Sequence, residues 1–130
     1  GINLDDGGSL MAFRIRSRDG AALWGHVAWR DAGGRLRHPA GVEVRFEPLR
    51  WWRSARSGGR YPIEALVTVM TTPRRRVRLV PLIDDQEIDA RASTGGHYWE
   101  GAVRALDADT GASLGRGYHE LTGYAEPLAL

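Results

Sequence analysis

The sequence contains no cysteine, and all 18 of its basic residues are arginine, so lysine is absent as well. Without cysteine the fold uses no disulfide, and the chemistry uses no thiolate. No apolar run approaches the ~20 residues of a membrane-spanning helix. The first residues, GINLDDGG, have neither the basic region nor the apolar core of a signal peptide. We therefore expect no transmembrane segment, and the start in mid-strand suggests a domain of a longer protein.

Several catalytic and binding motifs are also missing. There is no GxSxG elbow, no P-loop and no GxGxxG opening a helix. The four histidines are scattered without an HxH or HxxxH pair, so we expect no metal and no cofactor. The acidic run Asp84–Glu87 lacks the spacing of a calcium loop, and we interpret it as a solvated turn.

The pattern that is present is alternation of apolar and polar residues in short runs between glycine-rich turns. A period of 3.6 residues is not sustained anywhere, which favours an all-β protein. In Met11–Arg16, for example, the alternation predicts that Arg14 and Arg16 form a charged outer face. About eight antiparallel strands without a long crossover favour a single up-and-down barrel over residues 1–130. The expected strands lie in residues 1–6, 11–16, 23–30, 42–47, 61–71, 76–82, 97–106 and 114–122.

The stretch Leu49–Gly59, LRWWRSARSGG, breaks this alternation, and we expect a long loop that closes one end of the barrel. Its tryptophans and arginines are also ingredients of a nucleic-acid surface. The formal net charge is only +2, so a nucleic-acid partner is not expected. If the barrel holds a small molecule, we expect Trp24, Trp52 and Tyr61 to line the binding site.

The densest group of polar aromatic residues lies in residues 95–124 and has the pattern of a β-hairpin. If its loop is Ala108–Gly111, Trp99 lies opposite Glu120. Because side chains alternate along a strand, one face then carries four polar or aromatic groups, His97, Trp99, Tyr118 and Glu120.

A loop one residue longer or shorter would instead place Tyr98 and Glu100 beside Tyr118 and Glu120. The four-residue loop is preferred because it leaves Glu100 in water. It also buries Glu120, which requires a neutral or hydrogen-bonded carboxyl group. The shared face is either a satisfied polar network in the core or a ligand or catalytic pocket.

Five segments carry a resemblance to a known family: LDDGGSLMAFRIRSRDG, PLRWWRSARSGGRYPIE, LIDDQE, YWEGAVR and GRGYHELTGY. In this order they resemble the C-terminal domain of the family of carotenoid 1,2-hydratase (hydroxyneurosporene synthase) and the AttH-type secreted hydrolases. The resemblance implies a lipocalin-like (calycin) barrel that follows an N-terminal lipocalin-like domain in a larger bacterial protein. It further implies a periplasmic or secreted location and a hydrophobic, polyene- or lipid-like ligand.

In the hydratase branch, a histidine and a tryptophan two apart, and a tyrosine and an acid two apart, are implicated in catalysis. The resemblance places these roles on His97, Trp99, Tyr118 and Glu120. Hydration of an isolated alkene would use Glu120 as proton donor, Trp99 to stabilise the cation, and His97 or Tyr118 to position water. The alternatives are a non-catalytic barrel that binds a ligand or supports the N-terminal domain, and a pericyclase-like pocket that only shapes its substrate.

Overall fold

The computed structural model describes residues 1–38, 41, 43–71, 74–93 and 95–126, which contain ten β-strands and no helix. None of these residues forms a helix that is long and apolar enough to cross a membrane. The strands are β1 (Ile2–Leu4), β2 (Ser9–Arg16), β3 (Ala22–Arg30), β4 (Leu36–Arg37), β5 (Val44–Arg53), β6 (Arg60–Val69), β7 (Arg75–Pro81), β8 (Glu87–Asp89), β9 (His97–Asp107) and β10 (Ser113–Leu121).

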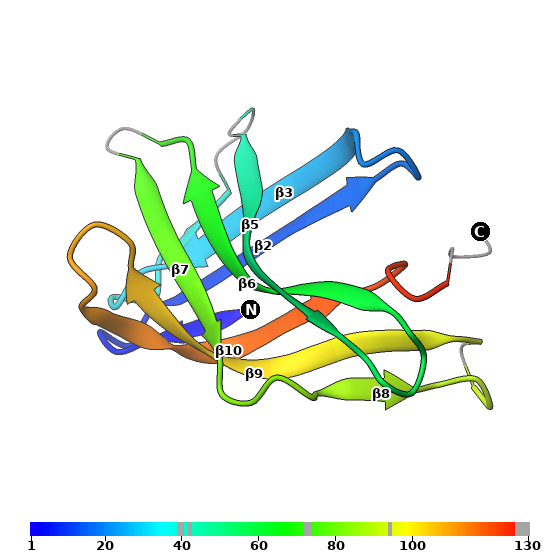
Figure 1. The fold of residues 1–130 in the computed structure, drawn as a ribbon. Helices are drawn as coiled ribbons and strands as arrows, with labels where there is room; N and C mark the ends of the chain where they lie inside the picture. The colour runs from blue at the N-terminus through cyan, green and yellow to red at the C-terminus, as the bar shows by residue number, and fades with distance from the viewer. Residues whose placement is uncertain (39–40, 42, 72–73, 94, 127–130) are drawn as a thin grey trace.

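All ten strands belong to one antiparallel sheet, ordered β4-β3-β2-β1-β10-β9-β7-β6-β5, with β8 added to β9. The sheet curls so far that its green end, β5 to β7, lies across from the blue end, β2 and β3 (Figure 1). Strands that pair in the sheet are consecutive in the chain, with two exceptions. The β7–β9 pair skips β8, and the β1–β10 pair joins the two ends of the chain. The all-β, up-and-down and lipocalin-like prediction is confirmed, as a curled half-barrel with two more strands than expected.

The inner face of this curl carries the core. Its most buried side chains come from opposite parts of the sheet: Val27, Tyr61, Ile63, Val69, Trp99 and Val103. They belong to one continuous apolar cluster that also includes residues of β1, β2, β5, β7 and β10. At roughly 25 cal/mol per Å² of apolar surface buried, this cluster is the main source of stability.

The strand β2 faces the other way from its predicted orientation. Leu10 and Ala12 pair with Trp29 and Val27 on the inner face, and Arg14 follows them on that side. Met11, Phe13 and Ile15 therefore lie on the outer face. The predicted charged outer face of this strand is wrong, because register, not apolar content, decides which alternating set meets the core.

The segment Leu49–Gly59, expected to be a loop, is a strand in its first half. β5 continues to Arg53 and pairs with β6 as far as Arg60, interrupted by two bulges after Pro48 and Arg50. The bulges explain the broken alternation, since each extra residue moves the following side chains to the other face. Only Ser54–Gly59 forms the connection to β6.

Candidate functional site

The hairpin of β9 and β10 has the predicted turn. The Asp107 N–H donates to Ala112 O and the Gly111 N–H donates to Asp107 O, both at 2.8 Å. Leu106 lies opposite Ser113, as counting from a loop at Ala108–Gly111 requires. The four-residue turn is confirmed.

The register then shifts by one residue at a β-bulge between Ser113 and Gly115. Gly115 has a φ of 152°, and a Cβ there would lie 2.0 Å from the Asn3 carbonyl oxygen, so the backbone of β1 lies directly against it. After the bulge Gly115 faces Ala105, and every later side chain of β10 changes face.

The shared face predicted for the four residues is therefore wrong for two of them. Tyr118 is 50% exposed on the outer face, and Glu120 lies beside it in solvent, accepting a hydrogen bond from the Thr122 hydroxyl at 3.0 Å. Glu120 is opposite Glu100, and Tyr118 is opposite Ala102. His97 and Trp99 remain on the inner side, where Trp99 is fully buried and its Nε1 donates to Asp84 O at 2.8 Å.

The inward position between Tyr118 and Glu120 belongs to His119, which no sequence pattern indicated. Its imidazole is buried, 6.0 Å from the Trp99 ring in an edge-to-face arrangement. Its Nδ1 has no hydrogen-bond partner among the described residues. Burial lowers the pKa of His119 to about 4, so the ring is neutral at pH 7.

The buried carboxylate on the inner side is Glu87, which lies in β8 opposite Trp99. Its side chain is fully enclosed. One carboxylate oxygen accepts hydrogen bonds from the Tyr61 hydroxyl at 2.8 Å and from the Ser57 hydroxyl. The other accepts from the Ser54 hydroxyl at 2.5 Å and lies 3.4 Å from the Arg56 Nε. These donors fasten the Ser54–Gly59 connection to β8.

The hydrogen bonds decide the charge of this group. Burial alone would raise the pKa of Glu87, but the donors Ser54, Ser57 and Tyr61 outweigh it and hold the pKa below its usual value. Burial, together with the hydrogen bond to Glu87, raises the pKa of the Tyr61 hydroxyl well above its usual range. At neutral pH Glu87 is thus an anion and Tyr61 a phenol, and neither is an acid strong enough to protonate an alkene.

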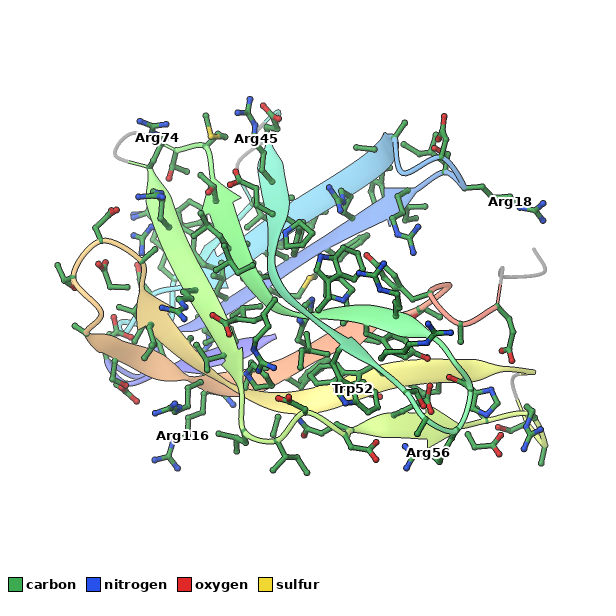
Figure 2. All side chains as sticks on the ribbon, in the orientation of Figure 1. Arg18, Arg45, Trp52, Arg56, Arg74 and Arg116 are labelled. Carbon is green, nitrogen blue, oxygen red and sulfur yellow. The ribbon has the colours of Figure 1, made fainter. Side chains whose placement is uncertain are left out.

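Tyr61 also joins an aromatic cluster at the same end of the curled sheet. Its ring lies 6.2 Å from Trp52 and 6.1 Å from Tyr124, and Tyr124 lies 6.3 Å from Trp51. The Arg16 guanidinium stacks 4.0 Å above the Tyr124 ring. Figure 2 shows Trp52 within the curl, whereas Arg45, Arg74 and Arg116 project from its outside.

Two of the three aromatic residues predicted to bind a ligand are thus brought together, Trp52 and Tyr61. Trp24 is not near them. It is 56% exposed on the outer face of β3, where its ring contacts Phe13 at a centroid distance of 5.0 Å.

Residues 122–126, which we call the strap, close the aromatic end. The Glu126 carboxylate accepts from the His97 N–H at 2.8 Å and lies 3.0 Å from its Nδ1. Arg16 donates to Gly123 O at 3.2 Å. The strap also packs closely on Gly59, where a Cβ would lie 2.9 Å from that of Ala125. His97 thus fixes the strap through Glu126.

Sequence reasoning missed Glu87 because the alternation around it is inverted. Ile88 is 38% exposed and its acidic neighbour Glu87 is buried, the reverse of what an amphipathic strand predicts. The rest of the acidic run is in solvent as expected, with Asp84 and Asp85 paired to Arg50 and Arg56. Among the described residues no group of three or more histidine or acidic side chains could hold a metal ion.

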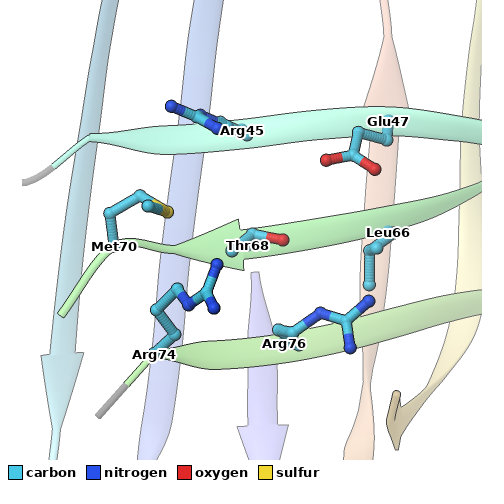
Figure 3. Close-up of a pocket in the computed structure, with 7 residues that line it drawn as sticks. All are labelled: Arg45, Glu47, Leu66, Thr68, Met70, Arg74 and Arg76. Carbon is cyan, nitrogen blue, oxygen red and sulfur yellow. The ribbon is translucent and has the colours of Figure 1, made fainter. Parts of the chain in front are cut away.

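A shallow hollow of about 230 Å³ lies on the opposite side of the sheet, on the outer face of β5–β7 (Figure 3). It is lined by Arg45, Glu47, Leu66, Thr68, Met70, Arg74 and Arg76. Two of its arginines are already paired, Arg45 with Glu43 and Arg76 with Asp109. None of the residues predicted from the sequence to bind a ligand or to act in catalysis lines this hollow.

Comparison with known proteins identifies a family and a similar solved structure. A family model described as AttH-like matches residues 1–124. The crystal structure of a protein from Nitrosomonas europaea, described as an AttH, superposes with a TM-score of 0.82 and 47% sequence identity. The match covers 95% of this chain and 36% of that one, so the chain spans about a third of the length of its relative. No curated protein matches.

Proposed function

This chain belongs to the AttH-like family, and we propose that it binds an apolar small molecule at the aromatic end of its curled sheet without transforming it. The observation that carries the proposal is the convergence of Trp51, Trp52, Tyr61 and Tyr124 at one end of a largely apolar inner face. Ligand sites are typically apolar and aromatic surfaces with a few placed polar groups.

The strap gives such a ligand a route to this surface. Arg16 holds it by donating to the Thr122 and Gly123 carbonyls and by stacking on Tyr124. The His97–Glu126 pair and the packing of Ala125 on Gly59 hold it as well. Trp51 is already 45% exposed there. Displacing the strap would carry Tyr124 with it and uncover Tyr61 and the inner face behind that ring. The Glu87 hydrogen bonds would keep the neighbouring connection in place.

The proposal is for binding because the two carboxyl groups that the structure describes at this end, Glu87 and Glu126, are poor proton donors: hydrogen bonds hold the pKa of each below its usual value. Glu87 is ionised and fully hydrogen-bonded, and Glu120 is on the outer face. Hydration of an isolated alkene, with His97, Trp99, Tyr118 and Glu120 in the roles that the resemblance implies, needs an acid in contact with the ligand. A barrel that holds its ligand without reacting needs none.

The test is a titration of the full-length protein with cis-parinaric acid, a polyene fatty acid that fluoresces in an apolar site. We expect saturable binding, and we expect Trp52→Leu to weaken it about tenfold, equivalent to about 1.4 kcal/mol of lost ring contact. The matched control is Trp24→Leu, which removes the same ring from the outer face and should leave the affinity unchanged. Glu120→Gln should leave it unchanged as well.

Two results would contradict the proposal. One is the absence of saturable binding, and the other is equal weakening by Trp52→Leu and Trp24→Leu. If Glu120→Gln abolished conversion of a bound polyene, the function would be hydration of the ligand and not binding alone.

A further inference from the structure

The outer face of β2, β3 and β4 is apolar and aromatic, which is unusual for an exposed face of a sheet. Its rows pair Met11 with Ala28, Phe13 with His26, and Ile15 with Trp24. Next to them Leu36 in β4 is 58% exposed, and the His38 ring stacks 5.7 Å from that of His26. Only Arg30, at one end, adds a charge to these rows.

The aromatic rings on this face are in contact with one another. Phe13 lies 5.0 Å from Trp24, and Trp24 is stacked on His26 at 6.4 Å. Side chains on this face are nevertheless strongly exposed, with Met11 at 42%, Ile15 at 47% and Trp24 at 56%. Contiguous apolar patches of this kind on a protein surface mark interaction sites, whereas single exposed apolar residues do not.

The outer face of β5–β7 has the opposite character. On β5–β7, Glu64 bridges Arg50 and Arg78. Further along the same strands Arg45 pairs with Glu43, and Arg76 with Asp109. Ion-paired side chains make that face polar, so the apolar composition of the β2–β4 face is not a general property of the sheet.

The alternation in β2 makes the same point. The more apolar set, Met11, Phe13 and Ile15, faces outward, and Arg14 and Arg16 face the inner side. Arginine is accommodated there by stacking, with Arg14 over Phe46 at 5.5 Å. A strand whose more apolar side faces away from its own core needs a second apolar surface to cover it.

We propose that this face is an interdomain interface, covered by another folded domain of the same polypeptide. The related structure has 64% of its chain (100 − 36) outside the match with this chain, enough for at least one further domain. Gly1 lies between β2 and β10, with its nitrogen 3.1 Å from Tyr118 O. Because Ile2 pairs with Leu10, Gly1 lies beside Met11, so polypeptide attached to Gly1 would start at the border of the apolar face.

The occupant is a domain that presents an apolar and uncharged surface, because the β2–β3 rows offer no acidic group and a single arginine. Interfaces between domains of one chain typically bury about 600–1,500 Å². A second copy of the chain would use the same face only through self-association, and this dependence on concentration separates the two occupants.

The experiment is thiol labelling of the full-length gene product. This segment has no cysteine, so Ile15→Cys places a single thiol on the apolar face. Arg116→Cys places one on the exposed, charged side of β10 as the matched control. Both positions are exposed, so neither change removes a core contact. Any thiols elsewhere in the polypeptide are replaced by serine, and labelling in denaturant confirms that the two positions react equally once unfolded.

We expect a bulky maleimide to label position 15 at least about tenfold more slowly than position 116 in the native protein, because reaction there requires the domains to separate. The slow rate should not change on dilution. Equal rates at the two positions would overturn the proposal. A rate at position 15 that rises on dilution would also overturn it, in favour of a second copy.

Discussion

Replacing Glu87 by glutamine is expected to lower the free energy of unfolding by about 2–3 kcal/mol, the cost of leaving buried donors without an acceptor. The carboxylate accepts from Ser54, Ser57 and Tyr61, three hydroxyls on two neighbouring segments. An amide of the same shape turns one acceptor into a donor that faces other donors. Equilibrium denaturation in urea, followed by tryptophan fluorescence, measures the change.

The control is Glu120→Gln, the same chemical change at an exposed carboxylate in the same sheet. Among the described residues its side-chain hydrogen-bond partner is the Thr122 hydroxyl, in solvent. We expect it to alter the free energy of unfolding by less than about 0.5 kcal/mol, as is usual for surface substitutions. Similar losses in the two variants would contradict the assignment of Glu87 as the buried anchor of the Ser54–Gly59 connection.

Glu87 also shows what the sequence could and could not predict. Alternation identified the positions of the long strands, because each of them has a regular apolar set. It failed for β8, where the buried residue is acidic and its neighbour Ile88 is exposed. Only the hydroxyl donors of a segment about 30 residues away make that burial favourable, and a local pattern carries no information about them.

The prediction of which side chains share the inner face of the hairpin failed for a related reason. Its turn is encoded locally by the ADTG segment and was predicted correctly. The bulge that follows is imposed from outside, by β1. A Cβ at Gly117 would lie 1.9 Å from the Gly1 carbonyl oxygen, and one at Gly115 would lie 2.0 Å from that of Asn3. Counting from the turn cannot anticipate a contact with the other end of the chain.

The face that β2 turns to the core shows the same limit. Its two alternating sets are both partly apolar, and the pattern favours Met11, Phe13 and Ile15 for burial. Pairing with β1, which sets Ile2 opposite Leu10, brings the other set inward. Local alternation therefore finds the strand, whereas the neighbouring strands decide its orientation.

His119 is expected to make the fold lose stability as the solution is acidified from pH 6.5 to pH 4.5. Its folded-state pKa is lowered to about 4, and an unfolded histidine titrates near 6.5. Above pH 6.5 neither state binds the proton and the full stability is present. Below it the unfolded state takes up a proton that the folded state refuses, so stability falls until the folded pKa is reached. The full effect is about 3 kcal/mol, most of it above pH 4.5.

The measurement is urea denaturation at pH 7, 5.5 and 4.5 for the native chain and for His119→Gln. We expect the native free energy of unfolding to fall steadily across this range, and that of the variant to fall much less, because glutamine has no proton to gain. The carboxylates with lowered pKa values, Glu87 and Glu126 among them, lose their contribution mainly below pH 4.5, outside the window. Equal slopes for the native chain and His119→Gln would show that the buried ring does not control the loss of stability in acid.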